Sequence, residues 1–435
     1  MKRRFKIFVI LLTAAMLFSS CASESVPAMQ TYNSGIPITT SPAPMPAESV
    51  SVITEKTTES LTEAVTTAET TQAPVYDYDE ERFSEKLAEI YTRYGIIGMS
   101  VALFKDGEII YTENLGYADR EKEILCDDNT RYRIASISKL ISTVGLMKMV
   151  DSGDLSLDTK LTEATGIEYD WEYSSDTVEL WHLLTHTAGL IDTWRFEYEP
   201  NMMYDINRLM KNAHSGAEPG TIFNYSNFGS GSIGSIIERI TGEYFHDYMD
   251  RALFTPLGMD AGYVIDLIED KESVANLYDY DGEILKPKEW GRDSDYYESF
   301  GLGNSYYAAQ CELIITASDL AQFGIALAGD GTVSGKTVLS PGSVAAMNKN
   351  YISTDKFDMG LNVRIYNDVV DGRTIYGHSG NALGCINGLF YDPSDRTGIV
   401  FLTNRCLPQV EENGFYSAIQ EAVTEAYYCF FDKEM

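Results

Sequence analysis

Ser136 and Lys139 are the residues whose types and spacing most directly suggest chemistry. They belong to the sequence Ser-Ile-Ser-Lys, which opens an apolar run from Ile137 to Val150 that predicts a buried helix. A serine at a helix N-terminus lies at the positive end of the helix dipole, beside backbone N–H groups without partners. Lys139 follows on the same face, and its amine can take the hydroxyl proton if burial keeps it partly neutral. Ser136 is therefore a candidate nucleophile with Lys139 as its base.

A second segment that can take part in this chemistry contains Tyr225 and Asn227. The turn-rich sequence 218–227 is expected to place both in a loop before a Gly/Ser-rich helix. A tyrosine near a lysine ammonium can carry a proton to a leaving group. Asn227 can donate to a substrate amide carbonyl and hold Lys139. The sequence contains no other Y-x-N.

A third segment contains His378, Ser379, Gly380 and Asn381 at the end of a predicted strand. A substrate can lie antiparallel along such a strand, and the backbone N–H of Asn381 can join that of Ser136 as an oxyanion hole. Two sequences with similar spacing lack this context. Ser353-Thr354-Asp355-Lys356 does not open an apolar helix, and His214-Ser215-Gly216 follows no strand. We assign neither of them a role.

The elements that must position these residues come from both ends of the chain and from its middle. Helical spacing predicts helices at both ends and a mostly helical middle, and runs of strand-forming residues predict a sheet. We expect an α+β fold in which strands from both termini form one antiparallel sheet around a helical insertion, with the active site between them. The predicted helices are 79–93, 317–327 and 415–430, the helical middle is 130–259, and the predicted strands are 99–104, 109–113, 361–366, 374–378, 385–391 and 398–403.

The first 76 residues predict export and attachment to a membrane. Residues 1–20 have a basic start and a short apolar run that ends before Cys21, and they resemble a bacterial lipoprotein signal peptide. Residues 22–75 contain 24 Ser, Thr or Pro among 54, so 21–76 is expected to be a disordered tether. We expect lipidation of Cys21, an extracytoplasmic location in the bacterial cell envelope and a folded domain at 77–435. Ordinary secretion with cleavage nearby is the alternative.

Charge and cysteine usage exclude several functions. The net charge of −32 argues against nucleic acid as a partner, because phosphate binding needs clustered Lys and Arg. The cysteines after Cys21 are five, scattered and without C-x-x-C spacing, and the histidines show no H-E-x-x-H pattern. We therefore expect no disulfide framework, no metal site and no cofactor. The sequence leaves the oligomeric state open.

The order S-x-x-K, Y-x-N and [KH]-x-G resembles the signature of the serine β-lactamase and penicillin-binding-protein superfamily. The resemblance is to the branch that contains class C β-lactamases, D-alanyl-D-alanine carboxypeptidases and related esterases. Two more segments, 181–190 and 255–259, resemble the "HLLTHTSGL" and "PLGM" sequences of that branch. The resemblance implies a β-lactamase/transpeptidase-like fold, with an antiparallel sheet flanked by helices and an all-helical subdomain.

The resemblance also implies roles for the candidate residues. Ser136 would be acylated, Lys139 and Tyr225 would transfer protons, and Asn227 would contact Lys139 and the substrate. His378 stands where many members have lysine, and it would contact the substrate carboxylate and tune Tyr225. The backbone N–H groups of Ser136 and Asn381 would form the oxyanion hole.

Two departures from the family pattern bear on the substrate. His378 carries only a partial charge at neutral pH, which favours a carboxypeptidase or esterase over an efficient class C β-lactamase. Glu312 lies in 308–315, where many relatives carry a "PAGGL" run, and it would disfavour anionic substrates if it bordered the cleft. His182 and His186 are expected to pack and bond the backbone, and 278–297 is expected to be a surface excursion.

The sequence therefore predicts a membrane-tethered serine hydrolase that acts through an acyl-enzyme on Ser136. The first expected substrate is the D-alanyl-D-alanine end of cell-wall peptides. Hydrolysis of esters or of D-amino-acid esters and amides is the first alternative, followed by β-lactam hydrolysis. A non-catalytic surface binding domain is the last alternative, and the complete set of Ser136, Lys139 and Tyr225 argues against it.

Overall fold

The strands predicted near both ends of the chain meet in one sheet. The structure is a computed structural model that describes residues 78–166, 177–192 and 213–432, which belong to one compact unit. The expected signal peptide 1–20, the lipidation residue Cys21 and the tether 21–76 lie outside the described residues. So do 167–176 and 193–212, two stretches of the expected helical middle.

The central sheet has nine strands, and every neighbouring pair is antiparallel. Strand β1 pairs with β15, so that Met99 lies opposite Thr403 and the two ends of the domain join in mid-sheet. This confirms the predicted antiparallel sheet built from both termini. In spatial order the strands are β10 (Ile352–Ser353), β11 (Asp358–Met359), β12 (Arg364–Tyr366), β13 (Ile375–Ala382), β14 (Cys385–Asp392), β15 (Thr397–Thr403), β1 (Gly98–Lys105), β2 (Glu108–Asp119) and β3 (Ile124–Leu125).

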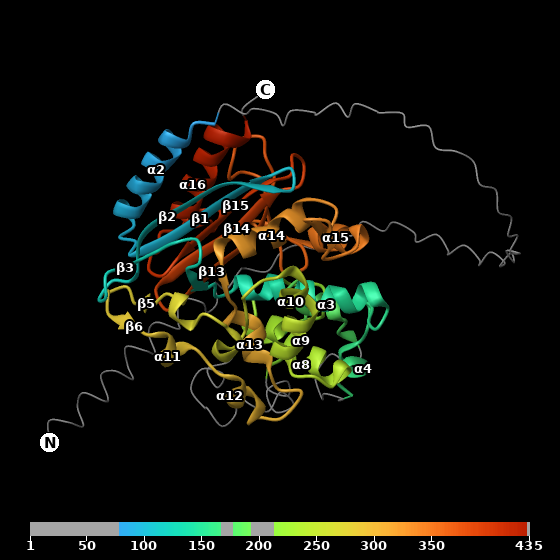
Figure 1. Cartoon of the computed structure of the whole chain (residues 1–435). Coiled ribbons are helices and arrows are strands. Elements are labelled where there is room, and N and C mark those ends of the chain that lie inside the picture. The colour runs from blue at the N-terminus through green and yellow to red at the C-terminus, as the bar shows by residue number, and fades with distance from the viewer. Residues whose placement is uncertain (1–77, 167–176, 193–212, 433–435) are drawn as a thin grey trace, which may run out of the picture. The chain divides into compact units, whose positions relative to one another are not determined.

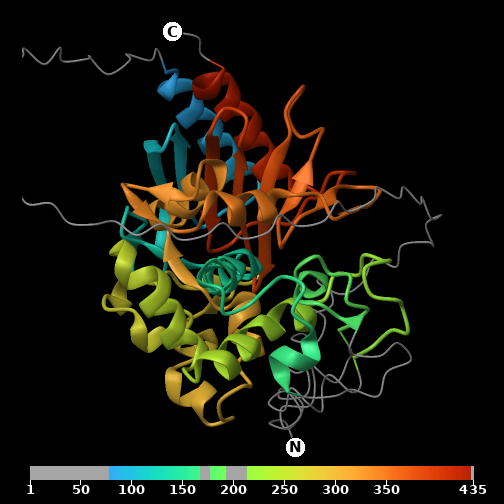
Figure 2. The same cartoon turned by 90° about the vertical axis from the view of Figure 1, so that its right-hand side faces the viewer.

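Two helices cover one face of the sheet, and the helical region lies on the other (Figure 1). Helices α2 (Glu80–Arg93) and α16 (Ser417–Ala426) lie side by side and pack on the outward residues of β1, such as Val101 and Leu103. The alternate residues Ala102 and Phe104 face the larger core on the opposite side, as strand periodicity requires. Figure 2 shows the same layers after a quarter turn.

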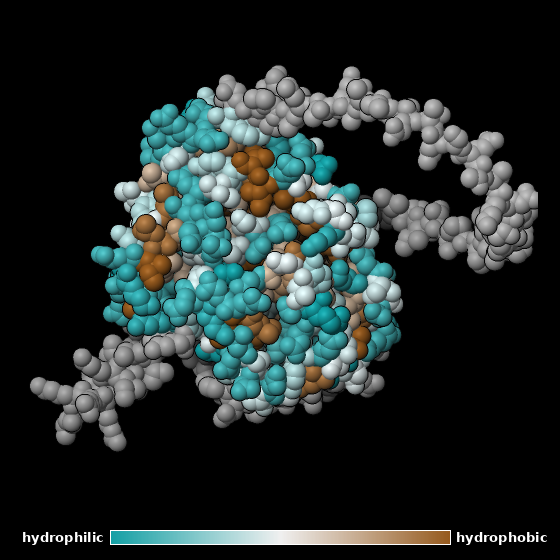
Figure 3. Space-filling model, in the orientation of Figure 1, coloured by the Kyte–Doolittle hydropathy of each residue, from teal (hydrophilic) through white to brown (hydrophobic). Residues whose placement is uncertain are grey.

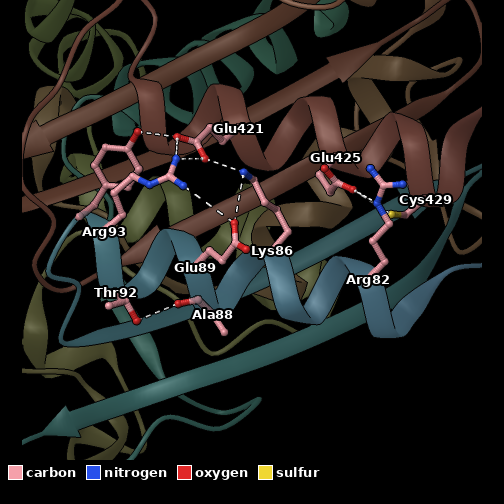
Figure 4. A network of polar contacts seen from close by, with 10 residues as sticks. Arg82, Lys86, Ala88, Glu89, Thr92, Arg93, Glu421, Glu425 and Cys429 are labelled. Carbon is pink, nitrogen blue, oxygen red and sulfur yellow. Dashed lines mark hydrogen bonds and ion pairs between the residues drawn. The ribbon is translucent and has the colours of Figure 1, made fainter.

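Ion pairs join α2 to α16 (Figure 4). Glu421 of α16 lies 2.8 Å from Lys86 and 2.7 Å from Arg93, and Glu425 pairs with Arg82. The hydroxyl of Tyr94 donates to Glu421 at 2.7 Å. These ion pairs lie around the buried apolar face of α2. They help to orient α2 against α16, whereas burial of the apolar side chains supplies most of the stability.

The helical region contains the remaining helices and three small two-stranded sheets. The helices are α3 (Ile137–Ser152), α4 (Leu161–Thr165), α5 (Leu180–Leu184), α8 (Asn227–Thr241), α9 (Phe245–Met249), α10 (Thr255–Leu257), α11 (Pro287–Trp290), α12 (Ser294–Glu298), α13 (Tyr306–Cys311), α14 (Ala317–Ala328) and α15 (Pro341–Asn348). The small sheets pair β4 (Arg131–Arg133) with β7 (Ile314–Thr316), β5 (Leu277–Tyr278) with β6 (Ile284–Leu285), and β8 (Thr332–Val333) with β9 (Lys336–Thr337).

Helix α3 is the buried helix that the sequence predicted. Almost all of its faces are apolar and buried, and Gly153 ends it in the left-handed conformation with φ 84°. Helix α8 approaches α13 closely at Gly231 and Gly234. A Cβ atom there would lie 2.4 Å from the carbonyl oxygen of Tyr306 and 2.5 Å from that of Ser305, so only glycine fits.

Three predicted elements differ from the structure. The predicted strand 361–366 is reduced to β12, and the predicted helix 415–430 ends its α-helical part at Ala426 and continues as a π-helical turn over Tyr427–Phe431. The expected surface excursion 278–297 is wrong in part, because Tyr278 and Tyr297 are buried. Their rings pack into the domain, and the tyrosine-rich composition alone did not reveal this.

The surface is mainly hydrophilic, with separate apolar patches (Figure 3). Among the described residues the most exposed large apolar side chains include Leu125, Tyr428 and Val410, which lie on different elements. Within the same residues, no helix has the length and apolarity needed to cross a bilayer.

Candidate active site

Ser136 stands at the N-terminus of α3, where its side chain makes no capping hydrogen bond. The preceding residue, Ala135, has a positive φ of 51°, a conformation that is uncommon for a side chain with a Cβ atom. This tight turn connects β4 to α3. It leaves the hydroxyl free to act while the helix dipole points at it.

Lys139 lies directly against this hydroxyl. Its side chain is fully buried, and Nζ donates to Ser136 Oγ at 3.0 Å and to the carbonyl oxygen of Gln310 at 2.9 Å. The carbonyl belongs to α13, so the helix that packs on α8 also fixes the amine. The structure therefore brings the candidate nucleophile and its candidate base within hydrogen-bond distance, as the helical spacing predicted.

Tyr225 lies beside Lys139, just before α8. Lys139 Nζ is 5.3 Å from the centre of the Tyr225 ring, and the guanidinium carbon of Arg364 is 5.6 Å from it. The ring centres of His186 and His378 lie 4.3 and 6.3 Å from that of Tyr225. Four residues from different parts of the chain thus converge on one phenol, which can exchange protons with its surroundings.

Asn227 is placed differently from the expectation. Its Nδ2 donates to Asp192 at 2.9 Å, and its backbone N–H donates to the same carboxylate oxygen. Among the described residues, the hydrogen bonds of Lys139 Nζ go to Ser136 and Gln310 instead. The sequence reasoning missed Asp192, an acidic residue two positions after the 181–190 segment.

His378 is a buried, neutral histidine. Burial, followed by the charges of Arg364 and Lys139, holds its pKa well below the usual range. Its Nδ1 lies 2.6 Å from the carbonyl oxygen of Ser379, so Nδ1 carries the proton and Nε2 is left as an acceptor. The lowered pKa reduces the positive charge that His378 can offer a substrate carboxylate. Its contact with the substrate stays a prediction.

The strand that contains His378 has an open edge beside the nucleophile. β13 pairs with β14 from Tyr376 to Ala382, but β12 covers it only from Ile375 to Gly377. A Cβ atom on Gly380 would lie 2.1 Å from the carbonyl oxygen of Ile134, so glycine lets this edge approach the turn before Ser136.

Ser379 and Asn381 occupy this open part of the strand. The Ser379 side chain is 8% exposed. The Asn381 side chain accepts a hydrogen bond from the Tyr280 hydroxyl at 2.8 Å and donates to the Tyr416 hydroxyl at 3.0 Å. The Tyr280 hydroxyl shows that the 278–297 segment, which was expected to be a surface excursion, reaches this strand.

Arg364 supplies the positive charge that His378 lacks. It lies on β12 opposite Gly377, and its guanidinium stacks over Phe357 at 4.8 Å. Burial opposes the charged form, but neighbouring tyrosines, including Tyr225, raise its pKa overall. Nε is buried without a partner, whereas Nη1 donates to the Tyr366 hydroxyl at 3.4 Å. The neighbours that raise the pKa of Arg364 most are tyrosines, not carboxylates. The signal available in the sequence was a lone charge inside the predicted apolar strand 361–366.

Glu312 does not present a free negative charge to the cleft. Its carboxylate lies 3.0 Å from Arg133, and the side chains of both residues are almost completely buried. Arg133 precedes Ser136 by three residues, and Glu312 follows Gln310 by two. The pair therefore ties β4 to the end of α13, and the expectation that Glu312 disfavours anionic substrates loses its basis because the charge is offset.

The two similar sequences set aside above do not form a comparable arrangement. Ser353 is exposed on the short strand β10 and opens no helix. His214 bonds the backbone of Gly216 within its own loop. In the described part of the chain, no cluster of three or more His, Cys, Asp or Glu side chains is arranged to hold a metal ion.

A serine at a helix N-terminus, a buried lysine on its hydroxyl and a tyrosine beside the lysine define a class of serine hydrolases that work through an acyl-enzyme. Residues 80–422 match the family model described as Beta-lactamase, so the chain belongs to the beta-lactamase family and is a serine hydrolase.

Relatives and solved structures agree with this assignment. The chain is 24% identical over 342 residues to penicillin-binding protein 4 of Amycolatopsis lactamdurans, over 75% of this chain and 86% of the relative. It is 25% identical over 187 residues to protein Flp of Staphylococcus aureus, over 42% of this chain but only 38% of Flp. The structure of the D-alanine carboxypeptidase AmpC from Burkholderia cenocepacia is similar with a TM-score of 0.62, at 19% identity over 81% of this chain and 99% of that one. At this identity the similarity shows the fold, which is the predicted β-lactamase/transpeptidase-like fold.

Proposed function

We propose that this hydrolase is carboxypeptidase-like and removes the last residue from the D-alanyl-D-alanine end of cell-wall peptides. The observation that carries the proposal is Arg364, a cation beside Tyr225 whose Nε is buried without a partner and whose pKa is raised mainly by neighbouring tyrosines. A peptide end supplies a carboxylate one residue beyond the bond to be cut. Guanidinium groups bind carboxylates with strong, charge-assisted hydrogen bonds.

The reaction follows from the positions of the side chains. Ser136 Oγ attacks the carbonyl carbon while its proton passes to the unprotonated amine of Lys139, whose Nζ is 3.0 Å away. The backbone N–H groups of Ser136 and Asn381 would stabilise the oxyanion. Tyr225 would give its hydroxyl proton to the leaving amine nitrogen as the C–N bond breaks, and the proton taken up by Lys139 would pass to Tyr225 in its place. Water then attacks the ester on Ser136, and the acid is released with the serine restored.

The test compares a carboxylate substrate with one that lacks the carboxylate. Replacing Arg364→Gln removes a charge-assisted contact worth about 1.5–3 kcal/mol, which predicts a loss of about 10- to 150-fold in kcat/KM on an N-acyl-D-alanyl-D-alanine peptide. The kcat/KM of Arg364→Gln on a p-nitrophenyl ester without a carboxylate should differ little from that of the wild type. Arg251→Gln, which removes another arginine stacked on a tyrosine, is the matched control. Equal losses on both substrates would contradict the proposal.

The neutral His378 favours a second candidate, the hydrolysis of esters or D-amino-acid amides. Because His378 gives β13 no fixed charge, the open edge of this strand does not select for a negatively charged substrate. For this candidate the wild type would cleave uncharged esters well and the peptide poorly, and Arg364→Gln would leave both rates unchanged.

A penicillin separates the remaining alternatives. Intact-mass spectrometry of residues 77–435 with the drug would give a stable adduct, absent in Ser136→Ala, for a penicillin-binding carboxypeptidase. Rapid loss of the drug would indicate a β-lactamase. If neither peptide, ester nor drug reacted and Ser136→Ala left the cellular phenotype unchanged, a non-catalytic binding domain would replace the proposal.

We propose further that the domain is held at the bacterial membrane by a lipid on Cys21. The support is the basic and apolar leader 1–20, the cysteine that follows it and the Ser/Thr/Pro-rich 21–76 segment. Cys21→Ser should move the protein from the membrane fraction to the soluble fraction. Unchanged membrane partition would contradict lipidation.

A further inference from the structure

Asp192 is an acidic residue beside the active site to which the proposed mechanism gives no role. Its Oδ1 accepts hydrogen bonds from Ser226 Oγ and the backbone N–H of Phe228, both at 3.0 Å. Its Oδ2 accepts from the backbone N–H and the side-chain Nδ2 of Asn227, both at 2.9 Å. One carboxylate therefore binds three consecutive residues, and these directly follow Tyr225.

A carboxylate suits this position for two reasons. The N-terminus of α8 offers backbone N–H groups without helical partners and the positive end of a 15-residue helix dipole. A carboxylate can only accept hydrogen bonds, so it forces Asn227 to turn Nδ2 toward Asp192. The side-chain oxygen of Asn227 must then face away from Asp192.

His186 fixes the same turn from the other side. Its ring lies against that of Tyr225, and its Nδ1 accepts the backbone N–H of Ser226 at 3.2 Å. Its carbonyl oxygen accepts the backbone N–H of Asn224 at 2.8 Å, and its φ of 57° lies in the left-handed region. The backbone on both sides of Tyr225 is thus bonded to His186 or Asp192.

From this arrangement we infer that Asp192 is a positioning residue that holds the Tyr225 hydroxyl at the proton-transfer distance from the reacting bond. Together with His186, it gives the 181–192 segment the role of holding the turn around Tyr225 in addition to packing. The inference rests on the proposed role of Tyr225 as the group that protonates the leaving atom.

The chain offers a matched control for simple helix capping. Asp151 accepts the backbone N–H of Ser340 at 2.7 Å and the hydroxyls of Ser340 and Ser343 at 2.6 Å, at the start of α15. It is also an aspartate that caps a helix from another segment. It differs from Asp192 in that α15 carries no active-site residue.

Two substrates with different leaving groups distinguish misplacement of Tyr225 from a loss of folded protein. An amide nitrogen must be protonated as it leaves, whereas the sulfur of a thioester with the same acyl group leaves readily as a thiolate. We expect Asp192→Asn to lower kcat about 10- to 100-fold on the N-acyl-D-alanyl-D-alanine peptide and less than about threefold on the matching thioester. Asp151→Asn should lower the thermal midpoint without changing the ratio of the two rates.

Two further measurements keep the inference testable. If Asp192→Asn fails to fold, Ser226→Ala serves as the second variant, because it removes one of the four hydrogen-bond donors to Asp192. It should shift the ratio of the peptide and thioester rates in the same direction by a smaller factor. If the wild type cleaves the thioester but not the peptide, the proposed function fails, and crystal structures of wild type and Asp192→Asn decide the inference. A displaced Tyr225 hydroxyl supports it. An unmoved hydroxyl, an unchanged rate ratio or an equal shift in Asp151→Asn would overturn it.

Discussion

Mild acid is expected to destabilise this domain because three of its histidines are buried in the neutral form. Burial lowers the pKa of His182 to about 4. Burial, together with the charges of Lys139 and Arg364, holds the pKa values of His186 and His378 well below the usual range. In the unfolded chain each imidazole has an ordinary pKa near 6.5. Below that pH the unfolded state binds protons that the folded state refuses, so stability falls as pH falls.

The size of the effect follows from the linkage between proton binding and folding. Each such histidine contributes a slope that approaches about 1.4 kcal/mol per pH unit below pH 6.5. At pH 5 each contributes about 2 kcal/mol of lost stability, and the three together contribute about 6 kcal/mol. A typical domain has only about 5–15 kcal/mol in total. Activity should fall only as the folded fraction falls, because the two histidines that flank Tyr225 stay neutral in the folded domain.

Urea unfolding at pH 7.5 and pH 5.0, followed by tryptophan fluorescence, measures the difference directly. His182→Gln and His378→Gln should each reduce the difference by about 2 kcal/mol, whatever they do to stability at pH 7.5. A wild-type loss below about 2 kcal/mol between the two pH values would show that these histidines are not held neutral in the folded domain. The same conclusion would follow if neither variant changed the loss.

Further predictions concern the base, a buried carboxylate and the α2–α16 contact. Lys139→Met should slow acylation of Ser136 by about 10²- to 10⁴-fold without lowering the thermal midpoint sharply, and a loss below tenfold in a stopped-flow assay would remove Lys139 as the base. Glu238→Ala removes the acceptor of four backbone N–H groups, three of them in buried hydrogen bonds: those of Phe245, Gly303, Asn304 and Ser305. The free energy of unfolding should therefore fall by about 3–5 kcal/mol, and a fall below about 1 kcal/mol would contradict these bonds. Glu421→Gln removes the partly exposed ion pairs with Lys86 and Arg93, and denaturant titration should show a loss of no more than about 1 kcal/mol, shrinking in high salt.

Elements with strong local periodicity were predicted closely, and elements defined by distant partners were not. The predicted helices 79–93 and 317–327 correspond to α2 (Glu80–Arg93) and α14 (Ala317–Ala328). Strand β2 extends to Asp119, well beyond the predicted 109–113, because pairing with β1 and β3 holds residues that lack a strand pattern. Tyr278 and Tyr297 are buried for the same reason: their packing partners lie elsewhere in the chain.

Local spacing in the chain was enough to predict the candidate nucleophile, its candidate base and the antiparallel sheet. One helical turn separates Ser136 from Lys139, and that distance depends only on local geometry. Tertiary structure alone decided the charge of the site. His378 is neutral and Arg364 carries the cation because burial and neighbouring charges come from strands and helices far apart in the chain. Asp192 holds the turn after Tyr225 for the same reason, since its partners lie more than thirty residues away.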